Sequence, residues 1–445
     1  MKHFLFSLRK IGPFQIITSS FLALILLGSL LLFIPAARSG GGSCSYLDAL
    51  FTSCSAVCVT GLVVHNTATF WSFFGRGVIL VLIQIGGLGV ITVVIAVSLI
   101  TGKRIGLRQR NLMQNAVNAP KIGGIIKFTR FLLIFTVLTE LCGAVLLVPA
   151  FGHRYGLIGG IRKAVFHAVS AFCNAGFDIL GDKTPYASLT GYQNNAVVNI
   201  VIMLLIIAGG IGFLTWDDMI RGKLRIKKMA LQTKLILVTS GLLIVIPAIL
   251  FFFFEFKTGG IGNRLLLSFF QSVTTRTAGF NTADIGAMSD RAKLIMIGLM
   301  LIGGSPGSTA GGLKTTTFAV IVLSASQYTR QRKNVSVMGR SLSMDVILNA
   351  FTLLVLYSLL FLSGSLLISV IEQLPVMDCM FECASALGTV GLTVGITPSL
   401  SAASKVILIC FMYFGRVGGL TLAYAALSGD HGGAGRFPEE KVMIG

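Results

Sequence analysis

Four short stretches of the sequence place a glycine where backbone carbonyls could bind a cation. They share a glycine at the third position and are Val59-Thr60-Gly61, Asn174-Ala175-Gly176, Thr277-Ala278-Gly279 and Thr389-Val390-Gly391. A Thr-Val-Gly run is the type of sequence with which potassium filters present carbonyl oxygens to a dehydrated ion. Such carbonyls carry no fixed negative charge, so the ion can also leave. The sequence therefore predicts a cation site at a filter of backbone carbonyls, and no other metal site.

The four glycines end copies of one pattern, Phe-x3-Ser-x5-Gly, which a bulky apolar residue follows. The copies begin at Phe51, Phe166, Phe269 and Phe381 and continue past the glycine with Leu62, Phe177, Phe280 and Leu392. Only the third copy departs from the pattern, with Val273 in the serine position. A lone copy arises easily by chance in a chain with 52 Gly, but four copies at near-equal spacing indicate an internal repeat.

Segments of three kinds surround the glycines in the same order. Long apolar segments come first, at residues 14–34, 128–148, 235–256 and 346–371. Stretches too short to cross a bilayer follow, at residues 46–57, 162–172, 263–275 and 376–387. A second apolar segment closes each quarter, at residues 74–100, 196–214, 294–323 and 406–427. We expect an all-α integral membrane protein with eight transmembrane helices and four re-entrant pore helices around one pore.

The composition agrees with a chain that lies mostly in a membrane. It is 54% hydrophobic and 12% charged, whereas soluble domains carry roughly 25% charged residues. The first apolar segment follows the basic residues Lys2, Arg9 and Lys10, an arrangement that also occurs in cleaved signal peptides. Its length and the later apolar segments favour a helix that is retained in the protein. We expect one transmembrane pore domain over residues 1–445, in quarters of approximately 1–110, 111–228, 229–340 and 341–445.

The net charge of +20 indicates membrane topology rather than a nucleic-acid partner. Basic residues gather in alternate linkers, as they do on the cytoplasmic side of membrane proteins. They are Lys103, Arg104, Arg108, Arg110, Lys121 and Lys127, then Arg221, Lys223, Arg225, Lys227, Lys228 and Lys234, then Arg330, Arg332, Lys333 and Arg340. With these linkers inside, both termini are cytoplasmic. A secondary role of the same faces in docking a partner stays open.

The second apolar segment of the third quarter contains a long break. Its residues are Gly303, Gly304, Ser305, Pro306, Gly307, Ser308, Thr309, Ala310, Gly311 and Gly312. Glycine and proline disfavour helix, and irregular backbone at membrane depth lines a water-filled cavity or is buried in protein. We expect this 303–312 loop to act as a gate. Glycine pairs at Gly86 and Gly209 in other quarters are equally explained by close helix packing.

Charged residues within apolar segments are expensive and mark candidate functional positions. Arg416 could form an electrostatic barrier that also anchors the gate, or it could be an arginine paired for packing, and Lys314 allows the same two interpretations. Acids near the outer mouth either concentrate cations or are ordinary solvated residues, and they are Asp178, Asp284, Asp378 and Glu382. The sequence assigns no role to Glu140 or Glu255.

Motifs for enzymatic chemistry and for a zinc site are missing. There is no P-loop, no Gly-x-Ser-x-Gly and no His-Glu-x-x-His, so catalysis is not expected. Cys54 and Cys58 are four residues apart, as are Cys379 and Cys383, but no His or further Cys at ligand spacing accompanies them.

The fourfold repeat with one glycine per loop, the break at residues 303–312 and Arg416 together resemble the membrane subunit of the Ktr potassium uptake system, in the Trk/Ktr/HKT superfamily. The resemblance covers nearly the whole chain. It implies potassium uptake across the cell membrane, with Gly61, Gly176, Gly279 and Gly391 as filter glycines and the 303–312 loop with Arg416 as an intramembrane gate. Members with Ser in the first loop favour sodium, so Gly61 indicates potassium.

The same resemblance implies partners that no residue of this sequence reveals. They are a second copy of the chain in a homodimer, each copy with its own pore, and a cytosolic ring of nucleotide-binding regulatory subunits. Sodium as an activating or symported ion is likewise implied by the family alone. Membrane lipid is the remaining expected partner, and no covalent cofactor is expected.

Two other functions stay open from the residues themselves. One is a sodium-preferring or unselective cation channel, and the other is a membrane scaffold whose glycines serve packing alone. Packing does not require Phe and Gly ten residues apart in every quarter, which favours ion conduction. The longer Thr-Val-Gly-Tyr-Gly ladder of potassium channels is absent, so we expect one dominant ion site and modest discrimination.

Overall fold

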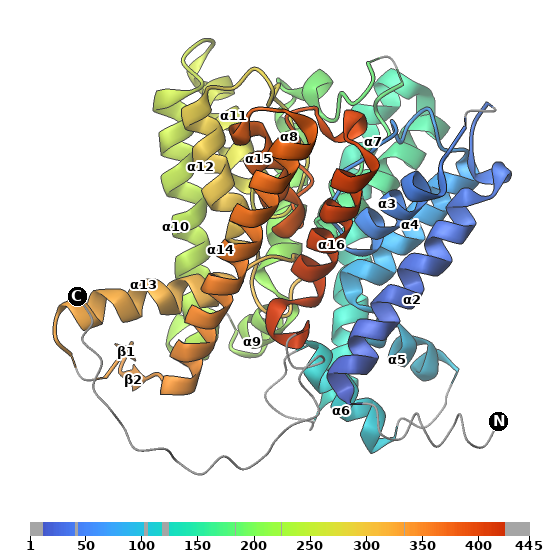
Figure 1. The fold of residues 1–445 in the computed structure, drawn as a ribbon. Coiled ribbons are helices and arrows are strands. Elements are labelled where there is room, and N and C mark those ends of the chain that lie inside the picture. Colours follow the sequence, from blue (N-terminus) through green and yellow to red (C-terminus); the bar gives the residue numbers. More distant parts are fainter. Residues whose placement is uncertain are drawn as a thin grey trace.

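The computed structural model describes residues 12–40, 43–101, 106–117, 124–182, 184–223, 225–332 and 334–422, which form a helical bundle (Figure 1). Both chain ends lie outside these residues. The expected cytoplasmic location of the termini therefore concerns a part of the chain that the structure does not describe. Lys103, Arg104, Lys121 and Lys333 of the basic linkers lie outside them as well.

A long helix precedes a short helix in every quarter. The long helices are α2 (Pro13–Phe33), α7 (Ile125–Phe172), α10 (Leu231–Phe254) and α14 (Met344–Glu372). The short helices are α3 (Tyr46–Val57), α11 (Ile261–Thr274) and α15 (Val376–Leu387). In the second quarter both are parts of α7, whose helical geometry is interrupted at Gly156. Each short helix ends a few residues before one of the glycine triplets.

The helices that follow the triplets are bent or broken. α4 (Phe73–Leu88) meets α5 (Val90–Ile100) at 94°, and α8 (Ala196–Ile211) meets α9 (Phe213–Arg221) at 90°. The 303–312 loop separates α12 (Asp290–Leu301) from α13 (Thr315–Thr329), and α16 (Ala402–Val417) ends at Gly418. In Figure 1, α13 extends sideways from the lower end of the bundle. Every quarter therefore has an irregular point in the helix after its triplet.

The remaining elements are short connections. α6 (Leu107–Val117) precedes α7, and β1 (Ser336–Val337) and β2 (Arg340–Ser341) form an antiparallel hairpin before α14. Single turns of 3-10 helix lie in four connections, at η2 (Pro35–Ala37), η3 (Thr190–Tyr192), η4 (Ile226–Lys228) and η5 (Thr397–Ser399).

The described helices include four candidate membrane spans by length and apolar composition, or six if each bent pair is one span. The sequence predicts eight, and the difference has a structural reason. α12 has 12 residues and α16 has 16, because the loop and Gly418 interrupt their apolar segments. Outward-facing side chains are strongly exposed, for example Phe253 at 63%, as expected of a surface that lies in lipid. The chain is a multi-pass membrane protein.

Short polar side chains set where five helices begin. Each accepts a hydrogen bond from the backbone N–H three residues later, and they are Ser45, Ser72, Asn195, Ser289 and Ser401. Two of these caps are tied to the preceding long helix. Glu255 accepts hydrogen bonds from the N–H and hydroxyl of Ser289, and Glu372 accepts the same pair from Ser401. Glu255, which has no role in the sequence analysis, therefore joins α10 to α12.

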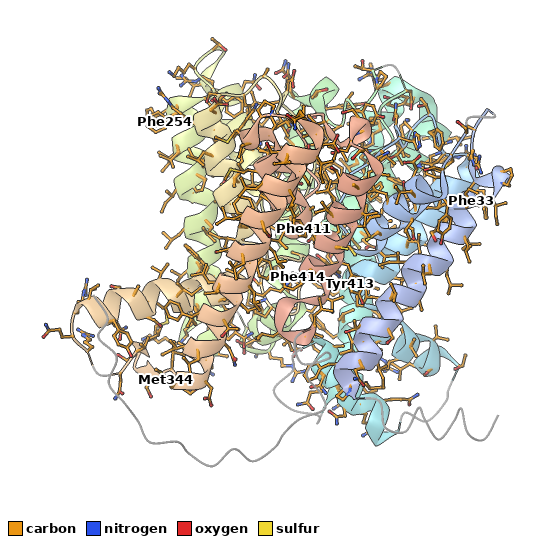
Figure 2. The ribbon with its side chains drawn as sticks, in the orientation of Figure 1. Phe33, Phe254, Met344, Phe411, Tyr413 and Phe414 are labelled. Atoms are coloured by element: carbon orange, nitrogen blue, oxygen red, sulfur yellow. The ribbon has the colours of Figure 1, made fainter. Side chains whose placement is uncertain are left out.

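The short helices pack in a cyclic order. Within a quarter, α3 lies against α2, α11 against α10, and α15 against α14. Between quarters, α4 lies against α7, α8 against α11, α12 against α15, and α16 against α3. The last contact joins the end of the described chain to its beginning, and Tyr413 of α16, labelled in Figure 2, also donates to the carbonyl of Thr18 in α2 at 2.8 Å. The four quarters thus close into a ring.

The aromatic residue that starts the repeat is buried in three quarters only. Phe51, Phe166 and Phe381 are buried, whereas Phe269 is 37% exposed and its neighbour Phe270 is fully buried. A shift of one residue turns a helical side chain by about 100°. The expected alignment of the third copy is therefore wrong at Phe269, since Phe270 occupies the buried position.

We expect Phe270→Ala to lower the free energy of unfolding by about 3–5 kcal/mol, because removal of a fully buried ring leaves a cavity. Phe269→Ala is the matched control, and its cost should be much smaller since that ring is partly exposed. Thermal unfolding of both purified variants in detergent measures the difference. Equal destabilisation, or a larger effect of Phe269→Ala, would contradict the one-residue shift.

Candidate cation-binding site

The four glycine triplets meet in a ring. A Cβ added to any of the four glycines would lie under 3.0 Å from the backbone of the next quarter's triplet. These collisions run from Gly61 to Ala175, from Gly176 to Gly279, from Gly279 to Val390 and from Gly391 to Thr60. In three of the four the nearest atom is the carbonyl oxygen of the middle residue in the next triplet. Four carbonyls and four glycines therefore alternate around one closed ring, in the order of the chain.

The triplets adopt left-handed backbone conformations at two of their three positions. The first residues have φ between 52° and 63°, the glycines have φ between 67° and 95°, and the first residues are Val59, Asn174, Thr277 and Thr389. Three of these four are β-branched, for which a positive φ is strained. Such strain persists only where the surroundings impose it, and it is concentrated at functional sites. The packing of the ring imposes this backbone.

Hydroxyl groups of the short helices hold three of the triplets. Ser55 and Ser385 accept hydrogen bonds from the N–H groups of Gly61 and Gly391, both at 3.0 Å. Ser170 instead donates to the carbonyl of Phe177, the residue after the second triplet, at 2.8 Å. These serines occupy the repeated serine position, so the sequence pattern locates the supports of the ring.

The third triplet is held by a residue that the sequence pattern misses. Val273 stands in the serine position and has no hydroxyl, and Thr274 beside it donates to the carbonyl of Phe280. Both Phe270 and Thr274 are therefore one residue closer to Gly279 than their counterparts in other quarters. The sequence contains one signal for this support, because Thr274 directly follows Val273, the apolar residue in the repeated serine position.

The short helices direct partial negative charge at the ring. The C-terminal end of a helix carries roughly half a negative charge on its free carbonyls. α3, α7, α11 and α15 all end a few residues before the ring glycines. The bulky residues that follow the glycines are buried, and they are Leu62, Phe177, Phe280 and Leu392. Helix ends and carbonyls therefore make the ring suitable for a cation, although it contains no carboxylate.

The 303–312 loop lies directly against the fourth triplet and the end of α7. A Cβ added at Gly311 would collide with the side chain of Thr389, and the hydroxyl of Thr309 donates to the carbonyl of Phe172 at 3.1 Å. The two ends of the loop meet, because the N–H of Gly303 donates to the carbonyl of Leu313 at 2.7 Å. The loop is therefore closed at its base and contacts the fourth triplet and the end of α7.

Backbone hydrogen bonds tie the loop to helices of two quarters. The N–H groups of Ser305 and Thr309 donate to the carbonyls of Gly210 and Gly209 in α8, at 3.0 and 3.3 Å. The N–H of Gly312 donates to the carbonyl of Gly415 in α16 at 3.2 Å. The carbonyls of these glycines thus accept hydrogen bonds from the loop, in addition to any role of the glycine pairs in helix packing.

Arg416 joins the loop to the first quarter. Its guanidinium donates to the carbonyls of Thr309, Gly86 and Gly87. Lys314 donates to the carbonyls of Ala310, at 2.8 Å, and Gly311. No carboxylate among the described residues forms an ion pair with either cation. Both residues therefore bind the loop through carbonyls, and Arg416 leaves positive charge beside it.

A cavity of about 350 Å³ borders the loop. Its wall includes Lys314, Arg416, Ser308 and the two bend glycines Gly89 and Gly418. The loop and the bends at Gly89 and Gly418 therefore border one space, which is roomy enough for a hydrated cation and lies next to two basic side chains.

Most acids near the expected outer mouth are engaged in structure. Glu382 is fully buried and accepts hydrogen bonds from the hydroxyls of Thr393 and Thr397. Asp378 pairs with Lys293 at 3.4 Å. Asp178 is half-buried and accepts from the N–H of Leu180, whereas Asp284 is exposed. Of the four, Asp284 is the most exposed, and it accepts a hydrogen bond from the N–H of Gly286.

An ion pair links the last quarter to the first. Lys405 of α16 lies 3.0 Å from the carboxylate of Asp48 at the start of α3. Burial opposes ionisation of Asp48, but the hydrogen bond from Ser45 and the charge of Lys405 lower its pKa below the ordinary value.

Within α7, Glu140 accepts a long hydrogen bond from Gln84 at 3.4 Å.

The described residues contain no group of three or more His, Cys, Asp or Glu side chains that could hold a metal ion. Cys54 and Cys58 lie 3.7 Å apart as free thiols, without a third ligand in that set.

The class of the protein follows from its apolar bundle and from comparison with known families. The family described as "TrkH: Cation transport protein" matches residues 3–429. The chain belongs to this family of cation transporters, which is not a family of enzymes. The resemblance drawn from its glycine repeat is thereby confirmed.

Curated relatives align along nearly the full chain. The chain is 39% identical over 448 residues to the potassium/sodium uptake protein NtpJ of Enterococcus hirae, with 98% of each chain covered. It is 38% identical over 442 residues to Ktr system potassium uptake protein B of Bacillus subtilis, covering 98% of this chain and 97% of that one.

A solved structure shares the fold. The potassium transporter TrkH from Vibrio parahaemolyticus superposes with a TM-score of 0.73 at 20% identity, covering 92% of this chain and 83% of that chain. At this identity the likeness concerns the fold alone.

We expect Gly311→Ala to destabilise the protein by about 1–3 kcal/mol, the usual cost of overpacking, because the methyl group would enter the side chain of Thr389. Gly298→Ala is the control, since a Cβ there meets nothing within 4 Å. Thermal unfolding measures both. The double variant with Thr389→Ala should recover part of the loss, and independent, additive effects would show that loop and triplet do not touch.

Proposed function

We propose that this protein takes up potassium through a pore whose selectivity filter is the carbonyl ring. The observation that carries the proposal is the mutual approach of the four glycines, which leaves space for carbonyls and for no side chain. The filter residues are Val59, Thr60, Gly61, Asn174, Ala175, Gly176, Thr277, Ala278, Gly279, Thr389, Val390 and Gly391. A ring of carbonyls replaces the water shell of a monovalent cation. Relatives named for potassium uptake favour this ion.

In this proposal each bent or broken second helix is one crossing of the membrane. That gives eight crossings, with the four short helices as re-entrant pore helices, in a single pore domain over residues 1–445. The broken helices support the assignment, because irregular backbone at membrane depth needs a cavity or protein around it.

The 303–312 loop is the proposed gate of this pore. The loop contacts the fourth triplet on one side and borders the cavity on the other, and this position supports its role as a gate. Arg416 would hold the closed position through its bonds to Thr309, Gly86 and Gly87. Movement of the loop would then require these carbonyl bonds to break.

The site also supports a second candidate function, sodium-preferring or unselective cation conduction. One carbonyl per quarter faces the neighbouring glycine, and a relative is named as a potassium/sodium uptake protein. We favour potassium because all four ring positions are glycine. A scaffold without transport is disfavoured by membership of a cation transporter family.

The proposed setting is the plasma membrane, with both termini in the cytoplasm. The basic linkers support this orientation. We further propose a homodimer that works with a cytosolic ring of nucleotide-binding subunits. Relatives named as proteins of a Ktr system support only the general point that further components take part. Sodium is proposed as an activating or coupling ion.

The unmodified chain should restore growth at low potassium to a cell that lacks potassium uptake. Gly279→Ser should raise the KM for potassium by about tenfold or more, because its side chain would collide with the carbonyl of Val390 in the ring. Uptake measured against external potassium gives the KM. Gly241→Ser, at an open position, is the control. An unchanged KM in a folded Gly279→Ser variant would reject the filter assignment.

Deletion of residues 306–310 should increase potassium flux. The base of the loop closes independently through Gly303 and Leu313, so the shortened chain can still join α12 to α13. Flux into proteoliposomes, normalised to monodisperse protein, is the measurement. A folded deletion variant with reduced flux would argue against a gate.

A further inference from the structure

A buried arginine lies immediately behind the third triplet. Arg276 precedes Thr277 and is only 8% exposed. Its terminal nitrogens donate to the carbonyl and hydroxyl of Ser240 in α10, at 3.4 and 3.2 Å. Its Nε has no hydrogen-bond partner among the described residues. The guanidinium is thus inside the bundle, close in sequence to the ring and only partly satisfied.

No carboxylate in the described part of the chain compensates this charge. None of the ion pairs of the described residues includes Arg276. It borders a small pocket lined by apolar side chains and glycines, among them Ile206, Ile244, Val273, Gly210 and Gly304. An arginine cannot shed its proton in a protein, so burial leaves a full positive charge at this position. Such a charge is expensive at membrane depth and calls for a function.

The other quarters carry no charge at the same place. The residue three positions before the ring glycine is Cys58, Cys173, Arg276 or Gly388 in successive quarters. Three of the four are small and neutral, so the backbone of the triplet does not require an arginine there. The arginine is an addition to the repeat, made in one quarter only.

We propose that Arg276 is an affinity-determining residue of the cation site: its uncompensated charge behind the third triplet lowers the affinity of the ring for potassium and speeds release. In a poorly screened interior a unit charge repels a cation over a long distance. Carbonyls and helix ends attract the ion, and a site that held it too firmly would not conduct. The inference rests on the proposed filter.

The test removes the charge in two ways. R276C places at this position the residue that the first two quarters carry, and R276M fills the volume of the arginine without charge. Both should lower the KM for potassium by about tenfold, the change that roughly 1.4 kcal/mol produces, and should also lower kcat. R276K keeps the charge, and S240A keeps the charge while it removes the hydroxyl partner. Both should leave the KM within about twofold.

Potassium uptake into proteoliposomes gives KM and kcat, and the midpoint of thermal stabilisation by potassium gives affinity separately. A KM that is unchanged or raised in R276C and R276M overturns the inference. So does the same change in R276K and S240A, which would indicate anchoring of the loop. If R276K folds and neither neutral variant does, the charge serves folding and the inference is again wrong. Failure of the unmodified protein to transport potassium contradicts the proposed function instead.

Discussion

The constraint on which the rest of the molecule depends is the close approach of four backbones at the ring of glycines. Any Cβ at Gly61, Gly176, Gly279 or Gly391 would collide with the next triplet, so the ring exists only if every quarter presents a glycine at the same depth. This approach depends on the long helices, on the capped starts of the helices after the triplets and on the cyclic packing of the short helices. If the ring glycine of any quarter were displaced by one residue along the chain, a side chain would occupy its place in the ring.

Hydroxyl groups and helix ends hold this arrangement without any charge at its centre. Ser55 and Ser385 bind the ring glycines of their quarters directly. Ser170 and Thr274 bind the residue that follows the glycine. The nearest acids are engaged elsewhere, as Glu382 is with Thr393 and Thr397. A site built from dipoles binds a cation less firmly than carboxylates would, which suits a site through which the ion must pass.

The repeat is least regular in the third quarter, where several exceptions coincide. This quarter has the shifted Phe270 and Thr274, the buried Arg276 and the loop that interrupts its second helix. The basic side chains Arg276, Arg416 and Lys314 all lack a carboxylate partner among the described residues. Three quarters thus form a nearly uniform frame, and the departures from symmetry gather near the proposed path of the ion.

Local composition was enough to determine the membrane class, the four triplets and the irregular 303–312 loop, because glycine, proline and apolar runs act over a few residues. The resemblance to a transporter family followed from the same motifs. Only the tertiary structure decided the order of triplets around the ring, the shift to Phe270 and Thr274, and the partners of Glu255 and Arg416. Neighbouring residues offer nearly equivalent patterns on a helix, and contacts between residues far apart in the chain select one of them. A linear pattern contains no such contacts, so burial and hydrogen bonding made that choice.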